Sequence, residues 1–567
     1  MLTTLTAPAF AGTWYIEDGD ITISAGESGN NVTQNENTTK NDTDTIITNR
    51  EEGASSHTVT IDAKDKDDKV EVTLKDVNID TSKQSKAAVS VTGSGDTTIE
   101  LDGDNELQGG DKHAGLEHNQ TVDSEGNVTS GKLTIQDDND NAGSLTATGG
   151  YFGAGIGGGS AKAGQVTITG GTITAISGDG AGIGGGQGNM GSNAGNADIE
   201  ISGGTIEATG GYTSAGIGGG YYGDATIKIT GDAVIKNAAG GFFGAGIGGG
   251  GGGNGDITIS GNAKIENAQG GYAGSGIGGG YGASGTVAIK DDSTVTATGG
   301  EVGAGIGGGV GGLADITIEG NATVNATGGV GSAGIGGGYD AEDDDDGTGN
   351  KITIKSNESG APTVNATGGE SSIDKKTGEK IPGGAGIGSG VGDAKANITL
   401  EGKVTIVAKA GEGNAAIGDM NGEQVFTGLD GSITRYDSEG NDTTLPTDPG
   451  YPVPADTSSS GGSSADASVQ ESVFPGLVVT DKDGQRISYT SIRGNNVLSL
   501  RVGRFTASLH ASLSTLRQLR AEGIDTITFQ TILCSTTLSV DELLAMGGED
   551  AEAVLTHRFT ASSLTVG

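Results

Sequence analysis

The chain has 567 residues, of which 73 are acidic and 32 are basic, so its formal net charge at neutral pH is −41. This excess of negative charge argues against nucleic acids and membranes as partners, and favours solubility or the binding of divalent cations. The single cysteine, Cys534, excludes both a disulfide framework and a cysteine-based metal site.

The first eleven residues, MLTTLTAPAFA, form a short apolar run that ends in Ala9-Phe10-Ala11. This ending fits the A-x-A cleavage site of a secretory signal, although the basic segment that opens such signals is missing. We therefore expect residues 1–11 to be the remnant of a signal peptide and the mature chain to begin at Gly12. The expected location is the cell surface or the medium.

Residues 12–110 contain short strand-like alternations with relatively few glycines. Val72 and Leu74, Ile79, and then Val89 are expected to form one coil of a solenoid, and Ile99 with Leu101, Leu107 and Leu116 the next coil. Solenoids need atypical terminal units, and we expect these first coils, which open at Trp14 and Tyr15, to be such a cap.

From residue 133 to residue 417 the chain is organised around a recurring glycine segment, first seen as G-A-G-I-G-G-G at residues 153–159. A period near 30 residues that holds over many copies indicates a solenoid. Insertions interrupt it at residues 340–349 and 370–383. The central isoleucine of the segment recurs as Ile156, Ile183, Ile217, Ile247, Ile277, Ile306, Ile335, Ile387 and Ile417.

Each repeat also holds an I-x-I alternation, such as Ile227 with Ile229, and a short run of the T-I-x-A type, such as Ile206 with Ala208. Period-two alternation of β-branched residues predicts strands with one face inward. Equivalent strands must pair in parallel, and such connections are right-handed. The expected fold is therefore all-β, a right-handed parallel β-helix with three short strands per coil, over residues 12–440.

In the glycine segment the same alternation would turn Ala215, Ile217 and Gly219 inward and Gly216 and Gly218 outward. We therefore expect one side of the solenoid to be a strip almost without side chains.

After residue 440 the composition changes. Residues 441–472 are rich in Pro, Ser and Gly, which predicts a linker. Residues 473–567 carry most of the arginines, and their basic and acidic residues nearly balance. Leu513, Leu516 and Leu519 indicate a helix, and residues 526–533 a strand, so we expect a small α/β module at this end.

Aromatic residues flank the glycine segment at two fixed positions. We expect them to line both edges of the glycine strip, where they can stack on a sugar ring or on one another. Mutual stacking that seals the turns is the simpler interpretation, and the two are compatible. Tyr151, Tyr212, Phe242 and Tyr272 lie five residues before the central isoleucine, and Tyr221, Tyr281 and Tyr339 lie four residues after it.

Carboxylate clusters are the candidate metal ligands, because calcium prefers six to eight oxygen ligands and acidic loops can supply several of them. None of the clusters has the spacing of a defined calcium loop, so a solvated acidic loop is the simpler interpretation. The candidates are Asp343, Asp344, Asp345 and Asp346 in one insertion, and Asp137, Asp138 and Asp140 at a turn.

Other functions have weaker support in the sequence. The string G-x-G-x-x-G at residues 153–158 is not a dinucleotide site, because it recurs many times and no helix follows it. A polysaccharide lyase or hydrolase needs clustered acids or a base beside calcium, whereas the five histidines are scattered outside the regular repeats. A threonine row that would suit ice binding is broken by Glu200, Lys228 and Ala288.

The combination of G-A-G-I-G-G-G, the run T-I-S-G-G-T-I-x-A-T-G-G and the terminal A-x-A resembles secreted bacterial carbohydrate-binding-domain proteins with glycine-rich β-helix repeats. That family is similar to calcium-bearing, polygalacturonate-binding β-helix proteins. The resemblance covers residues 12–418 and implies an exported, non-enzymatic protein that binds polysaccharide, with calcium as a candidate bridging ion. The alternative is an architectural stalk or adhesin that displays the C-terminal module and contacts another surface protein.

Overall fold

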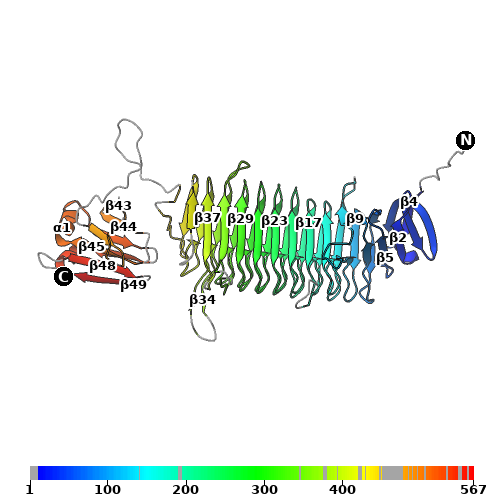
Figure 1. Cartoon of the computed structure of the whole chain (residues 1–567), viewed down its shortest axis with the longest axis horizontal. Coiled ribbons are helices and arrows are strands. Elements are labelled where there is room, and N and C mark those ends of the chain that lie inside the picture. The colour runs from blue at the N-terminus through cyan, green and yellow to red at the C-terminus, as the bar shows by residue number, and fades with distance from the viewer. Residues whose placement is uncertain are drawn as a thin grey trace. The chain divides into compact units, whose positions relative to one another are not determined.

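The structure is a computed structural model. It describes residues 10–566 except 140, 190–194, 344–346, 374–377, 379, 393, 419–423, 428, 446–447, 450–476, 483, 488, 495, 503–505, 532–533, 547–551 and 559–560. The chain divides into two compact units, Met1–Pro452 and Val453–Gly567. Figure 1 labels elements of both units.

The first unit is a parallel β-solenoid, as the sequence predicted, and it has about 15 turns. In the regular part each coil contributes three strands, and each strand pairs with the strand three places later, as in β13–β16, β14–β17 and β15–β18. The pairing produces three columns of parallel strands. Figure 1 shows successive coils stacked along one axis.

The first column contains the glycine segments. Its strands, in order, are β2 (Ile21–Ala25), β5 (Val59–Ala63), β8 (Val89–Gly93), β10 (Leu116–His118), β13 (Ile156–Gly157), β16 (Ile183–Gly184), β19 (Ile217–Gly218), β22 (Ile247–Gly248), β25 (Ile277–Gly278), β28 (Ile306–Gly307), β31 (Ile335–Gly336), β36 (Ile387–Gly388) and β39 (Ile417–Gly418).

The second column contains the I-x-I alternations. Its strands are β4 (Asn37–Thr48), β6 (Lys69–Lys75), the first part of β9 (Asp96–Gln108), β11 (Leu133–Gln136), β14 (Gly164–Ile168), β17 (Ala197–Ile201), β20 (Ala225–Ile229), β23 (Gly255–Ile259), β26 (Gly285–Ile289), β29 (Ala314–Glu319), β32 (Asn350–Lys355), β37 (Ala396–Glu401) and β40 (Gln424–Thr427).

The third column contains the T-I-x-A runs. Its strands are β7 (Asn78–Asp80), the second part of β9, β12 (Gly143–Thr148), β15 (Thr172–Ile176), β18 (Thr205–Thr209), β21 (Val234–Ala239), β24 (Lys264–Gln269), β27 (Thr294–Thr298), β30 (Thr323–Thr327), β33 (Thr363–Thr367), β38 (Thr405–Lys409) and β41 (Ser432–Tyr436).

The predicted equivalences between coils are confirmed by the strand register. Ile217 pairs with Ile183 on one side and with Ile247 on the other. In the early coils Val72 pairs with Ile99, as expected from their shared place in the pattern. The paired apolar residues are buried and form one continuous core along the solenoid. Each coil therefore buries its apolar side chains against its neighbours.

The N-terminal coil differs from the others. Strand β3 (Asn30–Gln34) pairs antiparallel with both β2 and β4, so a meander precedes the first regular coil. Strand β1 (Phe10–Tyr15) lies parallel to β4, and the short 3₁₀ helix η1 (Ile16–Asp18) follows it. Asp42 accepts hydrogen bonds from the Gly12 N–H and the Trp14 indole at 2.9 and 2.8 Å. β1 thus begins two residues before Gly12, where we expected the mature chain to start.

The C-terminal coil is closed by residues that the composition assigned to the linker. Arg435 in β41 makes a two-point ion pair with Asp448, whose side chain is fully buried. The Ile433 N–H donates to the Pro449 carbonyl at 2.9 Å. Residues 441–449 thus belong in part to the end of the solenoid, and the boundary between the two units lies after Pro452. In the second insertion, β34 (Ser372–Ile373) and β35 (Lys380–Ile381) form an antiparallel hairpin.

The second unit is a small α/β module with its own core, as the sequence predicted. One sheet contains β42 (Leu477–Thr480), β45 (Thr506–Ser512), β48 (Glu552–Arg558) and β49 (Ala561–Val566). The other contains β43 (Thr490–Gly494), β44 (Val497–Arg501), β46 (Thr526–Gln530) and β47 (Ser535–Ser539).

The two helices are α1 (Leu513–Ala521), on which the predicted leucines are buried, and α2 (Val540–Met546), which we had not predicted. In the part of the chain that the structure describes, no helix has the length and apolar character needed to cross a bilayer.

Candidate functional site

The glycine segments lie inside the solenoid, so the prediction of an exposed glycine strip is wrong. Gly216 and Gly218, expected to face outward, are buried like the Ile217 between them. A Cβ on Gly216 would lie 2.7 Å from the backbone nitrogen of Ala239, and one on Gly218 would lie 1.9 Å from the Gly248 oxygen. Only glycine permits backbones to approach this closely, which explains the composition of the segment.

The segment is buried because it forms a loop that enters and leaves the solenoid at the same edge. The Ala215 N–H donates to the Gly219 oxygen at 2.9 Å and closes this loop around the isoleucine. The turn that follows one glycine segment bonds to the turn that precedes the segment in the coil before, as in Tyr281 N–H to Phe243 O at 2.8 Å. The two turns on either side of the segment therefore lie side by side.

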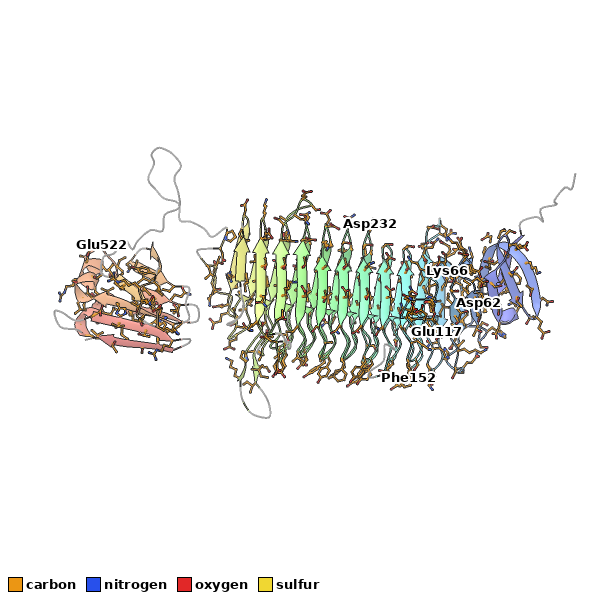
Figure 2. All side chains as sticks on the ribbon, viewed as in Figure 1. Asp62, Lys66, Glu117, Phe152, Asp232 and Glu522 are labelled. Atoms are coloured by element: carbon orange, nitrogen blue, oxygen red, sulfur yellow. The ribbon has the colours of Figure 1, made fainter. Side chains whose placement is uncertain are left out.

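This arrangement brings the two predicted aromatic columns together on one edge of the solenoid, instead of on opposite sides of a strip. Figure 2 labels Phe152 on this edge and Asp232 on the opposite edge. We call this surface the aromatic ridge. Its members are Tyr151, Phe152, Tyr212, Tyr221, Tyr222, Phe242, Phe243, Tyr272, Tyr281 and Tyr339.

Three rings of the ridge stack face to face in successive coils. The Tyr212 and Phe242 centroids are 5.3 Å apart with planes 15° apart, and those of Phe242 and Tyr272 are 4.6 Å apart with planes 5° apart. Both distances are close to the separation of about 4.8 Å between strands of neighbouring coils. The mutual stacking expected from the sequence is therefore confirmed for these three rings.

Phe243, which the sequence interpretation missed, joins the two columns. Its ring contacts Tyr212 and Phe242 edge-on, with centroids 5.6 and 4.9 Å apart, and reaches Tyr281 at 5.3 Å. Position −4 relative to the central isoleucine thus lies between positions −5 and +4. The recurrence of phenylalanine at position −4, as Phe152 and Phe243, could have identified this position from the sequence.

The ridge is unusually open for a surface of large apolar side chains. Tyr151 is 62% exposed, Tyr212 57%, Tyr281 49%, Tyr272 41% and Phe242 38%. Exposed contiguous aromatic surface of this kind is typical of binding faces rather than of inert exterior.

Tyr221 and Tyr339 are half-buried. Tyr221 lies against Tyr222, with ring centroids 4.3 Å apart. A side-chain hydrogen bond with Tyr222 raises the pKa of Tyr221. Tyr339 belongs to a later coil, where its ring lies beside Gly331.

The coil of Ile183, which lies between the coils of Tyr151 and Tyr212, has no aromatic ring at any of the three ridge positions. It carries Gly178, Asp179 and Gln187 there, at positions −5, −4 and +4 from Ile183. The Gln187 amide donates to the Asp179 carboxylate at 2.7 Å, and Asp179 is only 8% exposed. Burial raises the pKa of Asp179, and a hydrogen bond from the Thr213 backbone partly opposes this rise.

The candidate metal ligands are not brought together in the described part of the chain, where no group of three or more His, Cys, Asp or Glu side chains could hold an ion. Asp343 pairs with Lys395, whose ammonium lies 3.0 Å from one oxygen and whose backbone N–H donates to the other. Asp137 accepts from the Gly143 N–H, and Asp138 is exposed. Asp140 and Asp344, Asp345 and Asp346 lie outside the described residues.

The early coils contain a hollow of about 510 Å³, which is lined by threonine, serine and lysine side chains and by His118. The His118 ring is buried, with its two nitrogens 3.2 Å from the Val91 oxygen and 2.9 Å from the Gly131 oxygen. Both partners are structural backbone groups, so His118 acts in packing here.

The family described as "Beta helix repeat" matches residues 141–160, 166–187, 199–221, 287–310 and 316–339. No curated protein and no solved structure matches the chain. The match confirms the β-helix part of the resemblance found in the sequence, while a carbohydrate ligand, calcium and export stay predictions. Over these five segments the chain consists of β-helix repeats.

Proposed function

We propose that the solenoid is an exported, non-enzymatic polysaccharide-binding domain and that the aromatic ridge is its binding face. The observation that carries this proposal is the row of exposed rings along one edge, from Tyr151 to Tyr281. Apolar C–H faces of sugar rings pack on such side chains, and polar groups such as Asp179 and Gln187 can bond to hydroxyls. The negative charge of the chain favours neutral glycans, or acidic glycans bridged by calcium.

Affinity electrophoresis of the full chain tests this proposal. Gels would contain hydroxyethyl cellulose, xylan, galactomannan, polygalacturonate or mucin, each with calcium or with a chelator. We expect at least one polysaccharide to retard the protein, and the triple variant Tyr151→Ala, Tyr212→Ala, Tyr281→Ala to lose this retardation. Unchanged migration in every gel would refute the proposal. Loss of retardation only with chelator would assign a role to calcium.

The second candidate is an architectural stalk that displays the C-terminal module. It is favoured by the stacked rings of Tyr212, Phe242 and Tyr272, which cover one another's faces and thereby strengthen the turns. A stalk predicts association through the ridge with another protein or another copy, unaffected by sugars. A lyase would instead release unsaturated products that absorb ultraviolet light from polygalacturonate.

A further inference from the structure

The column of rings at position −5 is interrupted once between aromatic neighbours. Ile156, Ile183 and Ile217 pair in successive coils, so the coil of Gly178 lies between the coils of Tyr151 and Tyr212. With strands about 4.8 Å apart, Tyr151 and Tyr212 are attached about 9.6 Å apart. This separation is twice the spacing at which the rings of Tyr212, Phe242 and Tyr272 stack.

A ring placed midway would therefore lie about one strand spacing from the attachment points of both Tyr151 and Tyr212. Gly178 supplies no side chain to fill this position. A Cβ built on Gly178 would lie 3.5 Å from Tyr151 backbone atoms and 3.9 Å from the Gly150 oxygen, which are ordinary van der Waals contacts. The two rings that border the position, Tyr151 and Tyr212, are also the most exposed of the column.

Polar side chains lie in the coils that border the position beside Gly178. Asp179 and Gln187 are hydrogen-bonded to each other in the same coil as Gly178. In the next coil Thr213, adjacent to Tyr212, has a buried hydroxyl oxygen without a hydrogen-bond partner among the described residues. A buried hydroxyl of this kind is costly unless a ligand or water satisfies it.

We propose that a single pyranose ring of a bound glycan occupies the position beside Gly178, between Tyr151 and Tyr212, with its hydroxyls bonded to Asp179, Gln187 and Thr213. The inference rests on the proposed function and adds a sugar class to it. A pyranose that stacks on both faces must present C–H groups on both faces, which requires equatorial hydroxyls. The site therefore selects gluco- or xylo-configured residues over galacto- or manno-configured ones, whose axial hydroxyl obstructs one face.

The decisive variant is Gly178→Phe, which places a ring of the protein in the position assigned to the sugar. Gly178 has no positive φ, so the fold tolerates a side chain there. The matched control is Glu301→Phe, which adds a ring at position −5 in the coil after Tyr272, beyond the far end of the column. Thermal unfolding of both variants should match or exceed that of the wild type.

Affinity electrophoresis in hydroxyethyl cellulose, xylan and galactomannan provides the test. We expect the wild type to bind the first two at least tenfold more tightly than galactomannan, Gly178→Phe to lose at least tenfold in affinity, and Glu301→Phe to stay within twofold of the wild type. Tyr151→Ala and Asp179→Asn, which leave the position empty, should each weaken binding at least threefold.

The outcomes separate this inference from the proposed function. If Gly178→Phe binds like the wild type while Tyr281→Ala binds more weakly, the ridge binds glycan but the position beside Gly178 does not. A preference for galactomannan would overturn the sugar class. If no polysaccharide retards the wild type, both the proposed function and this inference fail.

Discussion

The ring of Phe242 lies face to face with that of Tyr272, with centroids 4.6 Å apart and planes only 5° apart, although the residues are a full coil apart in the chain. The same ring stacks on Tyr212 from the coil before. Phe242 is thus the middle member of a ladder that ties three coils together at the ridge.

Replacing Phe242 by alanine should remove both stacking contacts and the edge-on contact with Phe243. Each aromatic pair contributes about 0.5 to 1.5 kcal/mol beyond the area that it buries, so we expect a loss of about 1.5 to 4.5 kcal/mol in the free energy of unfolding. Urea denaturation followed by circular dichroism measures this loss. Phe242→Tyr is the matched control and should change stability by under about 0.5 kcal/mol. Equal stability of Phe242→Ala and the wild type would show that the stacked rings do not stabilise the solenoid.

The buried glycine segments make a second prediction. Gly218 has a φ of +138°, and a Cβ there would lie 1.9 Å from the Gly248 oxygen. Gly218→Ala should therefore destabilise the solenoid by more than about 3 kcal/mol, because both strain and overpacking oppose it. Gly53→Ala, at an exposed position where a Cβ meets nothing within 4 Å, should be nearly neutral. Similar melting temperatures for the two variants would contradict the burial of the segment.

The end of the solenoid supplies a third prediction. Arg435→Met leaves the Asp448 carboxylate buried without its partner, and such a change costs about 3 to 5 kcal/mol. Amide hydrogen exchange should then accelerate in β41 and in the preceding coil, and it should accelerate less in coils far from this end. Adding Asp448→Leu should restore much of the protection. Uniform exchange in wild type and variant would show that residues 441–449 are a linker after all.

A pH dependence follows from His118. Burial lowers the pKa of His118 below its usual value of 6.5, and hydrogen bonds to two backbone oxygens only partly oppose this. The unfolded chain therefore binds a proton at this site more readily than the folded chain. Stability should fall as the pH decreases from about 6.5 toward the folded pKa, where the loss levels off. Urea midpoints measured between pH 7.5 and 5 test this, with His118→Gln expected to flatten the slope.

Much of the solenoid could be predicted from the sequence because its repeat places equivalent residues in register. Ile217, Ile183 and Ile247 pair as their spacing required. In two coils the run carries one extra residue between its isoleucine and its alanine, from Ile235 to Ala238 and from Ile265 to Ala268. These are bulges, with register shifts where β21 pairs with β18 and where β24 pairs with β27.

The direction of the glycine segment could not be predicted in the same way. Alternation assigns faces only to residues that form an extended strand, and here only two residues per segment do so. The hydrogen bond from the Ala215 N–H to the Gly219 oxygen turns the segment inward. The sequence pattern does not reveal this bond, because glycine stands both at positions that pair with the neighbouring coil and at positions with a strained backbone. The convergence of the two aromatic columns follows from that turn and was missed with it.

The claim that the aromatic ridge is the glycan-binding face is tested most directly by hydroxyl-radical footprinting of the wild-type chain, read by mass spectrometry. Oxidation of Tyr151, Tyr212 and Tyr281 would be compared with and without hydroxyethyl cellulose or xylan, with Tyr15 and Tyr436, outside the ridge, as internal references. We expect at least threefold protection of the three ridge tyrosines and none at the references. Equal oxidation of the ridge with and without either polysaccharide, or protection confined to the reference tyrosines, would contradict the account.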